Sequence, residues 1–174
     1  LSGHLEYYKE NMYTFEIEEA GYVLKPMNCP GHSLIFKPRL RSYRELPLRL
    51  AELGTVYRYE RSGVLHGMMR VRGFTQDDAH IYCTRDQIFD EIVGVLDLVQ
   101  SFLKTFGYER YEVDLAVRYP QHREKYAGTS EGWERAEGAL VRALETRSLP
   151  YTRREGEAVF YGPKIDVRMF DAIG

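Results

Sequence analysis

Cysteine is scarce in this 174-residue sequence, which contains only Cys29 and Cys83. So few thiols argue against a disulfide scaffold and favour a reducing compartment, and we therefore expect a cytoplasmic protein. No apolar run approaches the roughly 20 residues of a membrane-spanning helix, so we expect no membrane partner. Excess charge is also lacking. The 24 basic and 26 acidic side chains give a net charge of −2, which disfavours non-specific nucleic-acid binding through bulk charge.

The N-terminus lacks the marks of a targeting segment. Residues 1–4 include no starting Met, no basic region and no apolar stretch, so they do not form a signal peptide. We expect a mature, trimmed or interior segment. The composition is that of a globular protein, with 44% hydrophobic and 29% charged residues, and the chain is long enough to bury a core as one domain.

Hydrophobic periodicity predicts an α+β domain. Two amphipathic helices are expected over 85–106 and 131–147. A capping box of Thr84 and Gln87 opens the first, and Gly107 follows its end. Shorter helices are expected over 30–40 and 46–53, and strands over 22–25, 55–60, 69–82, 111–117, 159–161 and 165–170. Because most links between strands resemble hairpins, the sequence predicts a mainly antiparallel sheet flanked by helices.

The predicted hairpin of 55–60 and 69–82 carries polar groups in alternation. Arg58 and Glu60 lie two residues apart, and residues two apart on a strand share a face. On the returning strand the alternating residues are Arg70, Arg72, Phe74, Gln76, Asp78 and His80. A solvated face is one explanation, but the opposite face is also partly polar, which favours a sheet that lines a cleft. Arginines in such a cleft indicate that it binds an anion such as phosphate or carboxylate.

Candidate metal ligands by residue type are Cys29, His32, His66, His80 and Cys83. The spacings Cys29-x-x-His32 and His80-x-x-Cys83 look like paired ligands, although the pairs lie much farther apart than in a zinc finger. If His80 lies on a strand, Cys83 faces the other way, which disfavours a metal shared by these two. A structural role for a lone Cys or His is the commoner alternative.

Several motifs resemble those of threonyl-tRNA synthetases, which are class II aminoacyl-tRNA synthetases. They are SGH at 2–4, KPMNCPGH at 25–32, YRYE at 57–60, GMMRVRGFTQDDAH at 67–80 and FYGPKID at 160–166. The block at 67–80 is the most specific, and the similarity covers essentially the whole chain in order. It implies that residues 1–174 are an interior part of the class II catalytic domain that includes motif 2.

The resemblance also implies a fold and a reaction. The fold is an antiparallel sheet flanked by helices, which agrees with the pattern above. The reaction is that of a threonine–tRNA ligase, which converts threonine and ATP, accompanied by Mg²⁺, into threonyl-adenylate and then transfers threonine to the 3′ end of its tRNA. Because the amino-acid carboxylate itself attacks the α-phosphate, the protein need not supply a nucleophile. The site must instead position the two substrates and neutralise the negative charge of the phosphate.

Site residues follow from the resemblance. Arg58 is expected to be catalytic, since it matches the motif 2 arginine that contacts the α-phosphate and the substrate carboxylate. Glu60 matches the residue that reads the adenine amino group, Phe74 the aromatic that stacks on adenine, and Arg70 a contact to the phosphate tail. Expected threonine contacts are Met27, Gln76, Asp78, Tyr161 and Lys164, and His4 matches a position near the tRNA terminus.

A zinc ion is implied as well. Cys29 and His80 match two of the three protein ligands, and the third is expected beyond Gly174. Valine and threonine are near isosteres, so a zinc that binds the amino group and the hydroxyl would reject valine where an apolar pocket could not. The other candidate ligands, Cys83, His32 and His66, are interpreted as mainly structural or loop residues.

Several parts of the family pattern are missing from the sequence. Motif 1 would precede Leu1, motif 3 would follow Gly174, and the editing and anticodon-binding domains are absent. We therefore expect the isolated segment to be inactive and the full-length enzyme to be a homodimer. A prolyl or seryl synthetase is one alternative, which Cys29 and His80 disfavour. A synthetase-like regulatory or RNA-binding protein without catalysis is another, which Arg58 and Glu60 disfavour.

Overall fold

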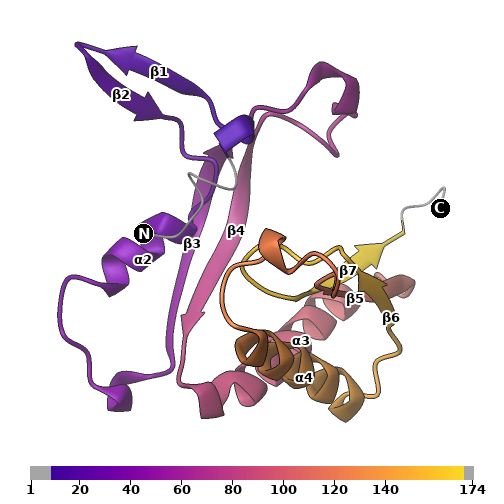
Figure 1. The fold of residues 1–174 in the computed structure, drawn as a ribbon. Helices are drawn as coiled ribbons and strands as arrows, with labels where there is room; N and C mark the ends of the chain where they lie inside the picture. The colour runs from indigo at the N-terminus through magenta and orange to yellow at the C-terminus, as the bar shows by residue number, and fades with distance from the viewer. Residues whose placement is uncertain (1–8, 171–174) are drawn as a thin grey trace. The chain divides into compact units, whose positions relative to one another are not determined.

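The structure is a computed structural model that describes residues 9–170 (Figure 1). Two compact units make up the chain, and the division falls between Tyr82 and Cys83. Among the residues that are described, no helix is both long and apolar enough to cross a membrane.

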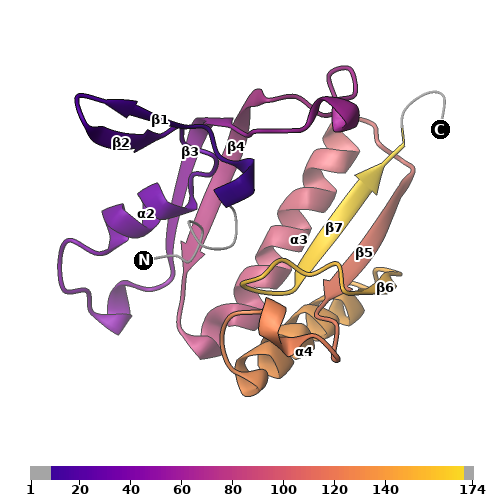
Figure 2. The same ribbon diagram turned by 45° about the horizontal axis from the view of Figure 1, so that its top comes forward.

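The described residues of the first unit, 9–82, form two hairpins and one α-helix. Strands β1 (Thr14–Ile17) and β2 (Ala20–Val23) pair antiparallel, and so do the longer strands β3 (Leu48–Tyr57) and β4 (Gly73–Tyr82). Helix α2 (Cys29–Phe36) lies alongside β3 in both views (Figures 1 and 2). Short 3₁₀ helices cover Lys9–Asn11, Tyr43–Glu45 and Ser62–Val64. The long antiparallel hairpin expected from the sequence is confirmed.

Strand β3 corrects one prediction. Residues 46–53 were expected to be a helix, but Leu48–Tyr57 is a strand whose exposure alternates along its length. Every β3 residue has a partner on β4, from Leu48 opposite Tyr82 to Tyr57 opposite Gly73. Leucine is a good helix former, but intrinsic helix propensities differ by less than about 1 kcal/mol per residue, so ten cross-strand pairs outweigh them.

The second unit packs two helices against a three-stranded sheet. Helices α3 (Ile88–Thr105) and α4 (Ser130–Thr146) confirm the two strongest sequence predictions. The sheet order is β6 (Thr152–Glu155), β5 (Tyr111–Val117), β7 (Lys164–Met169). Strand β5 runs antiparallel to β7 and parallel to β6. The predicted strand at 159–161 is reduced to one bridge between Val159 and Gly162, and β6 was not foreseen. Further 3₁₀ helices cover Arg85–Gln87 and Arg123–Lys125.

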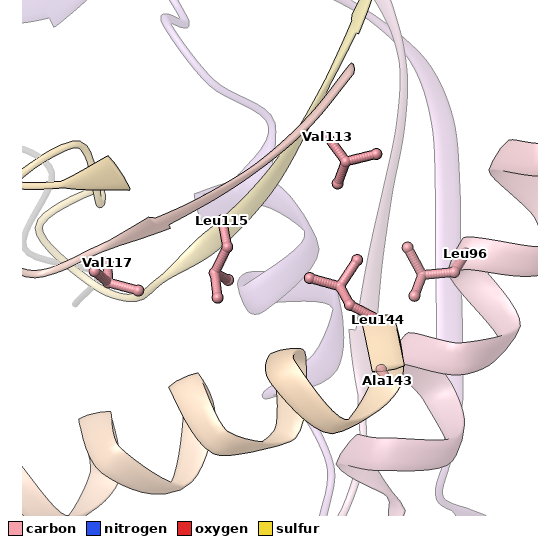
Figure 3. Packing of buried hydrophobic residues seen from close by; sticks show 6 residues of the cluster. All are labelled: Leu96, Val113, Leu115, Val117, Ala143 and Leu144. Atoms are coloured by element: carbon pink, nitrogen blue, oxygen red, sulfur yellow. The ribbon is translucent and has the colours of Figure 1, made fainter. Parts of the chain in front are cut away.

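The core of this unit lies between β5 and the two helices. Val113, Leu115 and Val117 point from β5 toward the helices, where side chains of α3 and α4 meet them (Figure 3). The buried cluster consists of Leu96, Val113, Leu115, Val117, Ala143 and Leu144. The predicted capping box of Thr84 and Gln87 is present, and Gly107 adopts a φ of +74° after α3. The α+β class and the mainly antiparallel pairing are therefore confirmed.

Candidate functional site

One face of the β3–β4 hairpin is the less exposed of the two and carries four of the expected site residues. On β4 this face presents Phe74, Gln76, Asp78 and His80, and on β3 it presents Leu50, Glu52, Gly54 and Val56. We call these eight residues the inner face. The alternation of polar groups predicted for 74–80 is therefore a real feature of the strand. Buried side chains from the 25–28 loop and α2 contact this face, whereas Leu53 on the opposite face is 78% exposed.

Asn28 joins the loop before α2 to the inner face. Its side chain is fully buried, and its Nδ2 donates a hydrogen bond to Asp78 Oδ2 over 3.0 Å. Gly54 leaves the room that this requires, since a Cβ at residue 54 would lie 2.4 Å from both Asn28 Nδ2 and Oδ1. Asn28 Oδ1 itself is buried without a hydrogen-bond partner. The amide therefore lies flat against a strand that carries no side chain there, and it fixes the Asp78 carboxylate.

His32 joins α2 to the same face. Its Nδ1 lies 2.7 Å from His80 Nδ1, with the two rings nearly perpendicular, and its Nε2 lies 3.1 Å from Glu52 Oε1. Lys25 Nζ lies 3.7 Å from the other Glu52 oxygen. His32 is only 3% exposed, whereas the side chains of Glu52 and Lys25 are 33% and 47% exposed, so the buried part of this chain of polar groups is the His32 ring.

Two expected metal ligands, Cys29 and His80, lie in this unit. Burial raises the pKa of the Cys29 thiol, and the nearby Asp78 carboxylate raises it further. Burial lowers the pKa of the His80 imidazole, which favours the neutral form that binds metals. Within residues 9–170, no group of three or more His, Cys, Asp or Glu side chains is arranged to hold a metal ion.

The expected ATP residues gather where the 58–72 loop leaves the strands. Arg58 Nε donates to the Pro26 carbonyl over 3.1 Å, and its guanidinium carbon lies 5.1 Å from the centre of the Phe74 ring. Glu60 is 8% exposed and accepts from Arg70 Nε and Nη2 at 3.2 and 3.0 Å. A cavity of about 390 Å³ is lined by Arg58, Glu60, Met68, Met69, Arg70, Val71 and Phe74.

Two details differ from the expected strand arrangement here. Strand β3 ends at Tyr57, so neither Arg58 nor Glu60 is part of a strand as predicted. Strand β4 begins at Gly73, so Arg70 and Arg72 precede the strand on which they were expected. A tight turn in which Glu60 N–H donates to the Arg58 carbonyl, over 3.0 Å, ends the regular pairing. Arg72 Nε donates to the Glu60 carbonyl over 2.9 Å and holds this turn in place.

The remaining expected residues lie elsewhere. Met27 is half-buried in the loop before α2. Tyr161 and Lys164 belong to the second unit, where Tyr161 packs edge-on against Phe160 and Lys164 pairs with Asp166 at the start of β7. His4 lies outside the described residues.

Sequence reasoning missed three residues of the inner-face contacts. Asn28 was passed over, His32 was interpreted as structural, and Glu52 fell in a predicted helix. The alternating pattern of β3 was the signal that could have placed Glu52 opposite Asp78, where the structure has it. The partners of His32 could not be found this way, because 48 residues separate it from His80.

Comparison with known sequences decides the family. The family described as "tRNA synthetase class II core domain (G, H, P, S and T)" matches residues 13–174. The chain belongs to this family. Within it, the chain is 58% identical over 174 residues to a threonine–tRNA ligase of Dehalococcoides mccartyi. The matched region covers 99% of this chain and 29% of that protein. The resemblance to threonyl-tRNA synthetases expected from the motifs is therefore confirmed.

Other members of the class II core family give the same result. A chloroplastic/mitochondrial threonine–tRNA ligase of Arabidopsis thaliana is 55% identical and covers all of this chain and 26% of that protein. A crystal structure of the RNA binding domain of threonyl-tRNA synthetase from Cryptosporidium parvum is 44% identical, with a TM-score of 0.90 over 99% of this chain and 42% of that one. The chain thus spans only about a quarter of the length of the curated relatives it matches.

Proposed function

We propose that this protein is a threonine–tRNA ligase and that the described chain is the part of its catalytic core that holds motif 2. Identities of 54–58% to threonine–tRNA ligases over the whole chain support this. The observation that carries the proposal is the order of residues along β4. Phe74, Gln76, Asp78 and His80 share one face, and Phe74 is about 13 Å from Asp78 at about 3.3 Å per residue. An extended aminoacyl-adenylate spans such a length.

Arg58 is the proposed catalytic residue. A carboxylate oxygen of threonine attacks the α-phosphorus of ATP, which enters with Mg²⁺, and the bond to the pyrophosphate oxygen breaks. Negative charge then collects on the α-phosphate oxygens, and a preorganised guanidinium stabilises it without reorganisation. The Pro26 carbonyl and the Phe74 ring support the orientation of Arg58 before the substrate binds.

Phe74 and Glu60 form the proposed adenine end of the site. The Phe74 ring offers a stacking surface, and the Glu60 carboxylate accepts from the adenine amino group. In the structure that carboxylate is paired with Arg70. Arg70 is proposed to contact the phosphate tail, so the arrival of ATP would divide the Arg70 donors between Glu60 and phosphate.

Asp78 is the central residue of the proposed threonine end. Its carboxylate, fixed by Asn28, is suited to accept from the hydroxyl or the ammonium group of threonine. Met27 and Gln76 are proposed to line the same end, and Tyr161 and Lys164 are also proposed threonine contacts. His4 is proposed to act near the terminal ribose of the tRNA.

Zinc fits the donor types present at this end. Cys29 supplies a thiol and His80 an imidazole, both of which zinc prefers. His80 uses Nδ1 toward His32, and among the hydrogen bonds and ion pairs of residues 9–170 none uses its Nε2. We propose that Cys29, His80 and a third ligand beyond Gly174 hold zinc, which when bound would supply a Lewis acid for the amino group and hydroxyl of threonine.

The partners proposed for the full-length protein are ATP, L-threonine and the tRNA for threonine. We also propose a homodimer and a cytoplasmic location, on the strength of the class II resemblance and the scarcity of cysteine. The described chain alone is proposed to be inactive, since it spans about a quarter of its relatives.

Aminoacylation tests the proposal. The full-length protein is incubated with ATP, total tRNA and each radiolabelled amino acid, and label in acid-precipitable tRNA is counted. We expect threonine to be attached, and Arg58→Ala to slow the attachment by about 10²–10³-fold. Attachment of another amino acid in its place, or of none by a folded protein, would refute the proposed activity.

A further inference from the structure

A chain of three side chains, Glu52, His32 and His80, links two strands and a helix. Glu52 and His80 lie on β3 and β4, and His32 projects from α2 between them. The contacts are 3.1 Å from Glu52 Oε1 to His32 Nε2 and 2.7 Å from His32 Nδ1 to His80 Nδ1. His32 is almost fully buried, so both contacts are made by a ring that is itself shielded from bulk water.

With His32 neutral, the order of the atoms dictates where the protons are. A carboxylate only accepts hydrogen bonds, so His32 Nε2 carries the proton that faces Glu52. In a neutral imidazole the other nitrogen is then an acceptor, and His32 Nδ1 can receive only a proton on His80 Nδ1. His80 Nε2 is therefore left with its lone pair, which is the electron pair that a metal requires.

We propose that His32, oriented by Glu52, is a positioning residue that fixes His80 in the Nδ1-protonated tautomer and holds its Nε2 ready for zinc. This inference rests on the zinc site proposed above. His32 does not touch the metal or the substrate in this account. The opposite tautomer of His80 would place a proton on Nε2 and turn the lone pair of His32 Nε2 toward the Glu52 carboxylate, which is repulsive.

Lys25 adds a second constraint on this chain. Its Nζ lies 3.7 Å from Glu52 Oε2, on the oxygen that His32 does not use. The carboxylate is thus held between an ammonium group and an imidazole N–H, which limits its rotation. Groups that hydrogen-bond the second ring nitrogen of a metal-binding histidine typically contribute 10–100-fold to metal affinity.

Two substitutions of His32 separate hydrogen bonding from packing. In His32→Asn, the amide oxygen takes the place of Nδ1 and can still accept from His80. In His32→Leu, the side chain fills similar space but accepts nothing. We expect His32→Leu to weaken zinc binding by about 10–100-fold, and His32→Asn to stay within a few-fold of the unsubstituted protein.

Glu52→Gln tests the far end of the chain. A glutamine can face His32 through either its oxygen or its amide nitrogen, so it no longer selects one tautomer of His32. We expect a loss of zinc affinity smaller than that of His32→Leu. The matched control is His122→Leu, which removes an exposed histidine that also lies 3.1 Å from a glutamate, Glu124, and should leave zinc affinity unchanged.

The measurement is zinc affinity of the full-length protein by competition with a chromophoric chelator, supported by the visible absorption of the Co²⁺-substituted form. Wild-type affinity in a folded His32→Leu protein, or equal losses in the Leu and Asn variants, would overturn the inference. If His32→Leu does not fold, the comparison of His32→Asn with His32→Gln decides, since Gln lacks an acceptor at the Nδ1 position. Unchanged zinc binding in Cys29→Ser and His80→Ala would instead refute the metal site itself.

Discussion

Replacing Gly54 with Ala should disable the threonine end of the site while leaving the ATP end intact. The added Cβ would lie 2.4 Å from Asn28 Nδ2 and Oδ1, whereas ordinary contacts at such glycines are 3.4–4 Å. Asn28 must therefore move by about 1 Å (3.4 − 2.4) in a place where it is fully buried. Overpacking of this kind costs about 1–3 kcal/mol of stability.

The catalytic consequence follows from the bond that Asn28 makes. Its displacement breaks the 3.0 Å hydrogen bond to Asp78, and a hydrogen bond to a charged group contributes about 1.5–3 kcal/mol. If that energy orients Asp78 toward threonine, kcat/KM for threonine should fall by about 10- to 100-fold, at 1.36 kcal/mol per factor of ten. The KM for ATP should change little, because Gly54 is two pairs away from Phe74 along the hairpin.

Threonine-dependent exchange of pyrophosphate into ATP measures both quantities in the full-length protein. Gly21→Ala is the matched control, because residue 21 is also a strand glycine and has open space around it. Asn28→Ala should show a similar loss by itself, and adding Gly54→Ala to it should cost little more, since the clash is gone. Normal threonine kinetics in a folded Gly54→Ala protein would refute the reasoning.

Three further predictions concern charged groups. Arg58→Lys should restore little of the roughly 10²–10³-fold loss in adenylate formation expected for Arg58→Ala, because a lysine cannot present a planar fork to the phosphate; single-turnover adenylate formation measures this. Arg70→Ala should raise the KM for ATP in the exchange assay, because it removes a phosphate contact and leaves the buried Glu60 carboxylate unpaired. Arg147 lowers the pKa of Asp97 through a hydrogen bond. Because the folded-state pKa is depressed, this pair stabilises the protein fully above the unfolded value of 3.8. The difference in thermal midpoint between wild type and Asp97→Asn should therefore be present at pH 7 and disappear as the pH falls from that value through the lower folded-state pKa.

Periodic segments of the sequence predicted their structures well. Helix α4 has a continuous apolar stripe that includes Trp133 and Leu144, and its predicted ends differ by one residue from Ser130–Thr146. The first part of β3 was mistaken for a helix because Leu46–Leu53 is rich in helix-forming residues and is followed by Gly54. Its pairing with β4 comes from residues more than 15 positions away, which local patterns do not register.

The site was predictable only where a motif fixed each residue. The alternation from Phe74 to His80 places its members on one face of β4, as the period of a strand requires. The buried contacts of Asn28 and His32 depend on α2 and its loop folding over that face. Since sequence separations of about 50 residues divide the partners, no spacing rule joins Asn28 to Asp78.

Selectivity in threonine activation tests the central claim most directly. Pyrophosphate exchange by the full-length protein is measured with threonine, serine and valine, for wild type and Asp78→Ala. The account predicts strong exchange with threonine, detectable exchange with serine, which lacks only a methyl group worth about 1–3 kcal/mol, and background with valine. It also predicts that Asp78→Ala loses threonine activation while its ATP binding persists. Valine activated as well as threonine, or full threonine activation in Asp78→Ala, would contradict the proposal that this face of β4 selects the amino acid.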